Sequence, residues 1–195
     1  MDDGKKQLIH DRAKELFIEK GFKDTNVAEI TRKAGVAVGT FYLSYPSKEK
    51  LFMEIFIEEN NALKQRCLDA LDFSQSPQAI TARMLQLNLE GMHENPILRQ
   101  WYQPGISQKL EQLFREENAV GSLSFLYDAF LVVVERWQAE GKIRRDIDSR
   151  MIMMVFAAIA NADTHKDEIG FEYFPELLHV MGDLVLRGLA DTGTP

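Results

Sequence analysis

The sequence contains very little cysteine, the residue that cross-links many exported domains and binds zinc in many metal-stabilised ones. Cys67 is the only cysteine among 195 residues, so neither an intrachain disulfide nor a cysteine-rich zinc site can form. We interpret this lone thiol as a small core residue of a helix rather than as a redox sensor. The cysteine content therefore gives no sign of export.

Long apolar runs are also absent. The longest, residues 151–160, is well below the roughly 18 residues that a membrane span needs, and no charged region followed by an apolar run opens the chain. At 45% hydrophobic residues, the chain still has enough apolar surface for a substantial core. We therefore expect a folded cytoplasmic protein without a membrane partner.

Signatures of common enzyme classes are missing as well. There is no G-x-S-x-G, G-x-x-x-x-G-K-[ST], G-x-G-x-x-G or H-E-x-x-H pattern. A local cluster of Asp163, His165, Asp167 and Glu168 has metal-ligating side chains, but a solvated helix end explains it better. We predict no enzyme, no cofactor and no bound metal; an all-α enzyme is the alternative that turnover of a substrate would reveal. The histidines are widely scattered: His10, His93, His165 and His179.

Charge is distributed unevenly along the chain. The net charge of −7 by itself argues against a nucleic-acid partner, because neutralising phosphates calls for a basic surface. However, residues 1–50 hold ten Lys/Arg and eight Asp/Glu, whereas residues 51–195 hold thirteen and twenty-two. A mildly basic module on an acidic body is expected when only one end of a protein meets an anionic partner.

Apolar residues recur at helical spacing almost throughout, and no segment shows sustained alternation, so we predict an all-α fold. Asn26 is expected to cap the amide of Glu29 while Glu29 reaches back, which begins the second helix. Gly21 and Gly35 suit the ends of the first two helices. We expect helices at residues 5–20, 26–35, 38–44, 48–71, 77–94, 97–118 with a break at Pro104-Gly105, 122–141, 149–166 and 175–189.

The second and third of these helices are short and are joined by Ala34-Gly35-Val36-Ala37, which predicts a helix-turn-helix. Residues 38–44 are unusual for a core helix, since they are rich in hydroxyl groups and aromatic rings and begin with small side chains. Such a helix can bring its N-terminal end close to bases. Ser47 and Lys48 then place backbone amides and an ammonium at the start of a long helix, which suits an anion.

Residues 25–42 (T-N-V-A-E-I-T-R-K-A-G-V-A-V-G-T-F-Y), followed by residues 45–52 (Y-P-S-K-E-K-L-F), resemble the N-terminal signature of the TetR (tetracycline-repressor-like) family. The resemblance covers about residues 8–56. The helix lengths, the turn glycine and the Gly-Thr-x-Tyr and Ser-Lys-Glu elements all match the family signature in the same register. The rest of the chain matches only in helical pattern and length.

The resemblance implies an N-terminal three-helix helix-turn-helix domain, residues 1–46, and a helical ligand-binding and dimerisation domain, residues 47–195. It implies a homodimer that binds a palindromic operator in double-stranded DNA, usually as a repressor, with activation as an alternative. We expect a small apolar or amphipathic effector to release the DNA. The alternative from another class is a helical ligand-binding or scaffolding dimer without operator binding.

The resemblance also implies roles for individual residues. Thr40, Tyr42 and Lys48 would contact phosphates, because hydroxyls and an ammonium suit phosphate oxygens. Apolar side chains can read thymine methyl groups, and without the resemblance Phe41 and Tyr42 would be assigned to the domain core. Residues 38, 39 and 41 would face the base edges, and residues 25 and 26 would lie near the DNA backbone. The predicted DNA-contacting residues are Thr25, Asn26, Val38, Gly39, Thr40, Phe41, Tyr42 and Lys48.

Two residues depart from the family pattern. Ala37 stands where the family often has a capping serine, so the recognition helix lacks a side-chain cap typically worth about 1 kcal/mol. Ser44 stands where the family often has histidine. The missing cap, together with the acidic net charge, is what favours the alternative without DNA binding.

Residues 151–162 are apolar on every face, which requires burial on all sides. A monomer of this size could bury one side, so we expect this helix and the last helix to form a four-helix bundle with a second chain. A buried central helix in a monomer is the alternative. The predicted dimer interface is Phe156, Ala157, Ala158, Ala160, Leu177, Met181 and Leu184.

The middle helices concentrate large and adaptable side chains. Such stripes are usually core. The resemblance, however, implies that these helices enclose an effector cavity, which is typically apolar with a few polar anchors. The predicted lining residues are Met84, Leu87, Trp101, Tyr102, Phe125 and Phe130.

Overall fold

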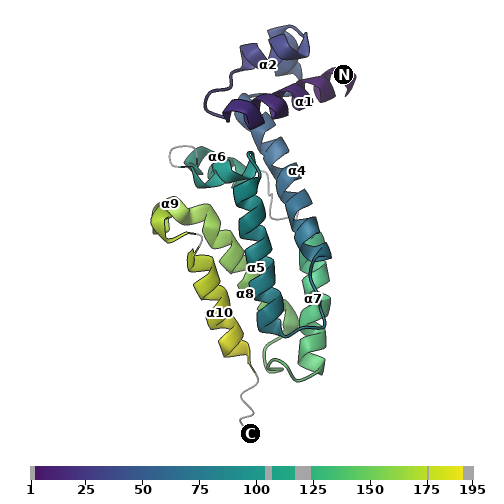
Figure 1. Ribbon diagram of the computed structural model, residues 1–195, viewed down its shortest axis with the longest axis vertical. Coiled ribbons are helices and arrows are strands. Elements are labelled where there is room, and N and C mark those ends of the chain that lie inside the picture. The colour runs from purple at the N-terminus through teal and green to yellow at the C-terminus, as the bar shows by residue number, and fades with distance from the viewer. Residues whose placement is uncertain (1–2, 104–106, 117–123, 175, 191–195) are drawn as a thin grey trace. The chain divides into compact units, whose positions relative to one another are not determined.

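The computed structural model of the chain describes residues 3–103, 107–116, 124–174 and 176–190 (Figure 1). In these ranges the regular elements are α-helices and short 3-10 helices, apart from one isolated antiparallel bridge between Ile143 and Ala190. The predicted all-α fold is confirmed. The expected break at Pro104-Gly105 and the expected helix start at Pro175 lie outside the described residues.

The helix boundaries agree closely with the periodicity of the sequence. Between the helices expected at residues 149–166 and 175–189, the structure forms a further short helix, α9, at Lys166–Ile169. The elements in chain order are α1 (Asp3–Lys20), α2 (Val27–Ala34), α3 (Val38–Ser44), α4 (Lys48–Asp69), α5 (Pro77–Glu94), η1 (Leu98–Tyr102), α6 (Ser107–Glu116), α7 (Ser124–Ala139), α8 (Ser149–Ala162), η3 (Asp163–His165), α9 (Lys166–Ile169), η4 (Phe171–Tyr173) and α10 (Glu176–Leu189).

The chain divides into two compact units. Unit 1 is Met1–Ala62 with Gly91–Glu117, and unit 2 is Leu63–Glu90 with Asn118–Pro195. The division passes through α4 and α5, so each of these helices contributes to both units. The sequence predicts a domain boundary after residue 46, just before α4 begins. That boundary stays a prediction about the extent of the DNA-binding module.

Unit 1 is built around aromatic packing. In α1, Ile9, Ala13 and Phe17 are completely buried, as the helical spacing of these positions requires when one face meets the core. The rings of Phe17 and Phe52 meet edge to face, with centroids 5.0 Å apart. Such pairs add specific geometry to the hydrophobic burial that holds α1 on α4.

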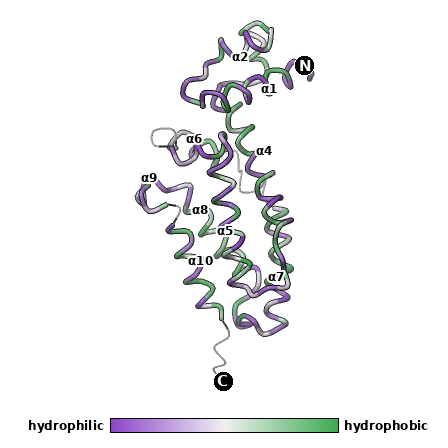
Figure 2. Tube along the Cα trace, viewed as in Figure 1, coloured by the Kyte–Doolittle hydropathy of each residue, from purple (hydrophilic) through white to green (hydrophobic). Residues whose placement is uncertain are grey.

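Unit 2 has its own core, in which α8 packs against α7 and α10. Trp137 of α7 and Ile152 of α8 are almost completely buried there. Apolar and polar residues are interspersed along the helices (Figure 2), and no described helix is both long and apolar enough to cross a membrane. The buried cluster comprises Leu71, Ile80, Val133, Val134, Trp137, Ile143, Ile152, Met153 and Leu189.

Candidate nucleic-acid interface

The helix α2 begins with the capping arrangement that the sequence predicts. The Glu29 amide donates to Asn26 Oδ1 at 3.0 Å, and the Asn26 amide donates to Glu29 Oε2 at 3.3 Å. Two amides that a helix start leaves without intrahelical partners are thereby satisfied. The Asn26 side chain is occupied in positioning α2, so a DNA contact through it stays a prediction.

The turn between α2 and α3 depends on Gly35. Its backbone is left-handed, with φ 66° and ψ 30°, and its amide donates to the Arg32 carbonyl at 3.2 Å. The Val36 amide donates to the Thr31 carbonyl at 3.0 Å, which closes the end of α2. A side chain at position 35 would be strained in this conformation. Ala37 then begins α3 without a side-chain cap, as its residue type predicts.

One face of α3 is open to solvent although it is largely apolar. Val38 is 47% exposed, Tyr42 56% and Leu43 76%, and Gly39 is also exposed. Thr40 is half-buried at the edge of this face. Leu43 was not among the predicted contact residues, because a leucine in a short helix reads as core from the sequence alone. We call Val38, Gly39, Tyr42 and Leu43 the α3 face.

The structure corrects the prediction for Phe41. Its side chain is completely buried, and its ring lies 5.3 Å from that of Tyr42 and 5.9 Å from that of Tyr45, measured between centroids. In this arrangement Phe41 holds α3 on the domain and has no surface to offer a base edge. The aromatic residue is needed inside because a domain of three short helices has few large side chains with which to fill its core.

Gly39 has space around it. A Cβ built at this position would meet nothing within 4 Å, and the backbone has no left-handed conformation that would require glycine. Glycine in a helix is unfavourable by about 0.5 to 1 kcal/mol relative to alanine. The fold itself therefore supplies no reason for glycine here, whereas close approach of an external molecule to the α3 backbone does.

Lys48 and Thr25 make contacts within unit 1. The Lys48 ammonium donates to the carbonyls of Phe22 and Thr25, each at 2.7 Å, and lies 4.1 Å from the centroid of the Phe22 ring. Thr25 is 1% exposed, and its hydroxyl donates to the Gly21 carbonyl at 2.7 Å. The two side chains thus organise the turn between α1 and α2. Phosphate contacts by either remain predictions that must take these bonds into account.

Cations on α1 and α2 lie beside carboxylates. Lys20 Nζ is 2.6 Å from Glu29 Oε2, and Lys33 Nζ is 3.2 Å from Glu15 Oε2. Hydrogen bonds from Lys20 and from Lys33 hold the pKa of Glu29 and of Glu15, respectively, below the ordinary glutamate range. Exposed pairs of this kind add little to stability. They nevertheless reduce the positive potential that the basic composition of residues 1–50 implied.

The six predicted effector-lining residues are divided between the two units. Trp101 belongs to unit 1, where its ring stacks on Phe56 with centroids 5.2 Å apart, and Tyr102 follows it in η1. Met84, Leu87 and Phe130 pack on the buried cluster of unit 2, and Phe125 is half-buried in α7. The cavities described within the two units, about 440 and 170 Å³, are lined by other residues. An effector pocket at these positions stays a prediction.

A charged group that the sequence did not single out is half-buried in unit 2. The Lys64 ammonium donates a hydrogen bond to the side-chain oxygen of Asn88. Desolvation by burial lowers the pKa of Lys64 to about 8, against opposing effects of Cys67 and Asp163. A lysine in the middle of α4 reads as solvated from sequence alone, because its burial depends on helices that come later in the chain.

The α8 and α10 helices expose a strip of apolar side chains. In α8, Ile152, Met153 and Ile159 are buried, whereas Met151, Met154 and Val155 are 58%, 49% and 38% exposed. Of the residues predicted at a dimer interface, Ala158, Ala160 and Leu184 are exposed. Phe156, Ala157, Leu177 and Met181 are half-buried, and Phe156 also packs on the core of unit 2. We call Met151, Met154, Val155, Ala158, Val180 and Leu184 the α8/α10 strip.

The predicted solvated helix end around His165 has its own internal pairing. His165 Nδ1 lies 3.2 Å from Glu168 Oε2, and both side chains are exposed by 40% or more. In the described ranges this segment does not form a metal-sized cluster of ligand atoms.

Comparison with known proteins gives evidence that is independent of the geometry of the site. A model described as bacterial regulatory proteins, tetR family, matches residues 9–55. The HTH-type transcriptional regulator YuxN of Bacillus subtilis (strain 168) is 30% identical over 91 residues, which is 47% of this chain and 31% of YuxN. The fatty acid metabolism regulator protein of the same organism is 36% identical over 58 residues, 30% of each chain. This chain therefore covers about a third of the curated relatives it matches.

Similarity to solved structures extends over nearly the whole chain. SmeT, the repressor of the Stenotrophomonas maltophilia multidrug efflux pump SmeDEF, aligns with a TM-score of 0.63 at 17% identity, covering 96% of this chain and 91% of SmeT. RolR in complex with resorcinol aligns with a TM-score of 0.61 at 17% identity, covering 96% and 88%. At such identities the likeness establishes the fold alone.

Proposed function

We propose that the chain is a regulator of the tetR family, whose model matches residues 9–55, and that it regulates transcription by binding double-stranded operator DNA through α3. The observation that carries the proposal is the α3 face: an exposed, partly apolar helix surface around a glycine with open space, presented by a capped helix-turn-helix. A helix of this kind fits the major groove, where bases display distinct donors, acceptors and methyl groups.

Individual groups on α3 suit different parts of the DNA. The hydroxyls of Thr40 and Tyr42 are placed at the domain surface and match phosphate oxygens. Val38 and Leu43 are apolar and exposed, which suits thymine methyl groups. Gly39 allows the α3 backbone to come close to the base edges. Lys48 holds the α1–α2 turn through two carbonyls.

We propose that a second copy of the chain covers the α8/α10 strip, giving a homodimer. Five large apolar side chains of the strip are exposed by 38% to 63%, which is more than scattered surface residues explain. A twofold bundle of α8 and α10 would bury them symmetrically. Two copies would present two α3 helices, as a palindromic operator requires.

A small apolar or amphipathic effector that releases the DNA completes the proposal, with repression as the mode. The repressor SmeT and the resorcinol complex of RolR share the fold. Unit 2 contains the hydrogen-bonded pair Lys64 and Asn88, which could serve as polar anchors, and the apolar side chains of Met84 and Leu87. An effector at the predicted positions would have to displace side chains that now pack on the core.

The proposal is tested by binding to a duplex that carries an inverted repeat from the DNA flanking the gene, followed by fluorescence anisotropy. We expect binding that weakens steeply with salt and exceeds binding to an unrelated duplex of equal length. Equal, weak binding to both duplexes would favour the helical scaffolding dimer instead.

The role of the α3 face has its own test in Gly39→Ala. The added methyl group would meet nothing within 4 Å, so the free energy of unfolding should be unchanged or rise by up to about 1 kcal/mol. Operator affinity should fall several-fold, because the methyl group occupies space that the bases approach. An unchanged affinity would contradict close approach of DNA at this residue.

A further inference from the structure

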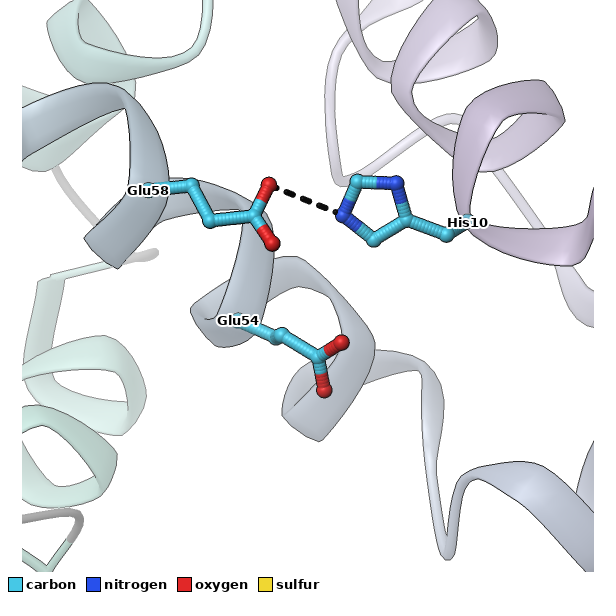
Figure 3. Close-up of side chains that lie close together, drawn as sticks. All are labelled: His10, Glu54 and Glu58. Atoms are coloured by element: carbon cyan, nitrogen blue, oxygen red, sulfur yellow. Dashed lines mark ion pairs between the residues drawn. The ribbon is translucent and has the colours of Figure 1, made fainter. Parts of the chain in front are cut away.

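The structure brings together three metal-ligating side chains that lie far apart in the sequence. His10 is in α1, and Glu54 and Glu58 are one helical turn apart in α4 (Figure 3). One ligand atom from each lies within 4.8 Å of the other two. All three residues belong to unit 1, so their proximity depends on packing within that unit.

His10 is oriented as metal-bound histidines are. Its Nδ1 lies 3.3 Å from Asp11 Oδ1, and Gln7 donates to the same Asp11 oxygen at 2.8 Å. Asp11 Oδ1 is therefore positioned to accept a hydrogen bond from an Nδ1–H. That tautomer leaves the Nε2 lone pair available, which is the arrangement found in carboxylate–histidine–metal groups.

The other ring nitrogen is buried without a hydrogen bond. His10 is 7% exposed, and Nε2 makes no hydrogen bond although Glu58 Oε2 lies 3.1 Å away. A buried polar atom without such a bond is costly. Figure 3 shows the ring directed at the side of α4 from which Glu54 and Glu58 extend. The nitrogen therefore faces the Glu58 carboxylate without a hydrogen bond, and a carboxylate oxygen of Glu54 also lies within 4.8 Å of a ring nitrogen.

The two glutamates are open on their other side. Their side chains are 40% and 51% exposed, so an ion can enter from solvent. Glu54 Oε1 is positioned by the Tyr45 hydroxyl at 3.3 Å and by Lys6 Nζ at 3.4 Å.

We propose that His10, Glu54 and Glu58 bind a divalent transition-metal ion of the Zn²⁺ type, with a fourth position open to water. One imidazole and two carboxylates suit such ions, whereas Ca²⁺ takes six to eight oxygens. Metal–ligand bonds of about 2.0 to 2.2 Å place ligand atoms about 3.3 to 3.6 Å apart, which small rotations of the two exposed glutamates achieve. The ion ties α1 to α4 within unit 1, and this binding does not depend on the proposed DNA-binding function.

The competing explanation is a protonated His10 that pairs with Asp11 and Glu58 and binds no metal. The two explanations differ in the response to Zn²⁺. Titration calorimetry on the full chain, stripped with a chelator, should show one Zn²⁺ per chain and a higher melting temperature with the metal, because binding favours the folded state. No saturable binding at one equivalent would overturn the proposal in favour of the ion pair.

Variants assign the site. Replacing both glutamates, Glu54→Gln and Glu58→Gln, should weaken Zn²⁺ binding by at least about tenfold, and these exposed positions tolerate the amides without loss of the fold. The matched control is Glu168→Gln, which removes the exposed carboxylate beside His165 and should leave the affinity unchanged. Binding that survives the double variant, or that is lost in the control, places the metal elsewhere and overturns the assignment.

X-ray absorption on the zinc-loaded chain gives a readout that does not depend on stability. The proposal expects one imidazole nitrogen and two or more oxygens at about 2.0 to 2.2 Å, with no sulfur at about 2.3 Å. The imidazole signal should disappear in His10→Gln loaded at the same metal concentration. A sulfur ligand would assign the ion to Cys67, and an imidazole signal that persists in His10→Gln would assign it to another histidine.

Discussion

The helices α3 and α8 both expose apolar side chains, yet their surfaces are built differently. On α3 the exposed residues alternate with hydroxyl groups around a glycine, and the helix has seven residues. On α8, a helix of fourteen residues, the exposed residues between Arg150 and Asn161 are methionine, valine and alanine. A mixed surface can meet phosphates and bases, whereas a continuous apolar strip is satisfied only by another apolar surface. The difference matches the roles proposed for the two helices, α3 toward DNA and α8 toward a second copy of the chain.

The largest expected effect tests the partner-facing strip. Ala158→Glu places a charge at the centre of the proposed twofold bundle, where burial without a partner costs several kcal/mol. Because Ala158 is exposed in the single chain, the variant should fold but sediment as a monomer. Val132→Glu, at a 66% exposed position of α7 outside the strip, is the matched control and should remain a dimer. A monomeric parent protein at micromolar concentration would end the bundle proposal.

The next effect separates structural from DNA-binding roles in unit 1. Lys48→Met removes the ammonium that donates to the Phe22 and Thr25 carbonyls, and should lower the free energy of unfolding by about 2 kcal/mol. If Lys48 also contacts phosphate, the slope of log affinity against log salt should fall by about one unit per half-site. Chemical unfolding and a salt titration measure the two effects separately.

Tyr42→Phe is the comparison for Lys48→Met. The Tyr42 side chain is 56% exposed, so loss of its hydroxyl should leave stability within about 0.5 kcal/mol of the parent while operator affinity falls. If Lys48→Met changes stability but not the salt dependence, Lys48 acts by holding the turn alone. If Tyr42→Phe leaves operator affinity unchanged at every salt concentration, the predicted phosphate contact of the Tyr42 hydroxyl is wrong.

The smallest effect concerns the charge inside unit 2. The folded protein binds the Lys64 proton less tightly than the unfolded chain, so between about pH 8 and the ordinary lysine value of 10.5 stability should rise with pH. Lys64→Met, which keeps the length of the side chain, should be more stable than the parent near pH 7 by about 1 kcal/mol. The difference should shrink by pH 10.

Chemical unfolding of the parent and of Lys64→Met at several pH values measures this difference. The exposed Lys142→Met, whose lysine is paired at the surface with Glu140, provides the control and should show no such trend. A constant difference between parent and Lys64→Met across pH 7 to 10 would mean that the Lys64 ammonium is not desolvated.

The sequence by itself determined the features that depend on neighbours along the chain. Helical periodicity placed the helices, Asn26 and Glu29 predicted the capping box, and Gly35 predicted the left-handed turn, because backbone preference and hydrogen bonds within a few residues decide each of them. The missing cap at Ala37 was readable for the same reason.

Tertiary structure alone decided the burial and the partners of several side chains at the candidate sites. Phe41 is buried although its neighbours Tyr42 and Leu43 are exposed, and Lys48 is engaged with carbonyls that precede it by more than twenty residues. His10 meets Glu58 only because α1 packs on α4. Burial, desolvation and metal-sized proximity are sums over residues distant in the chain, and no local pattern contains them.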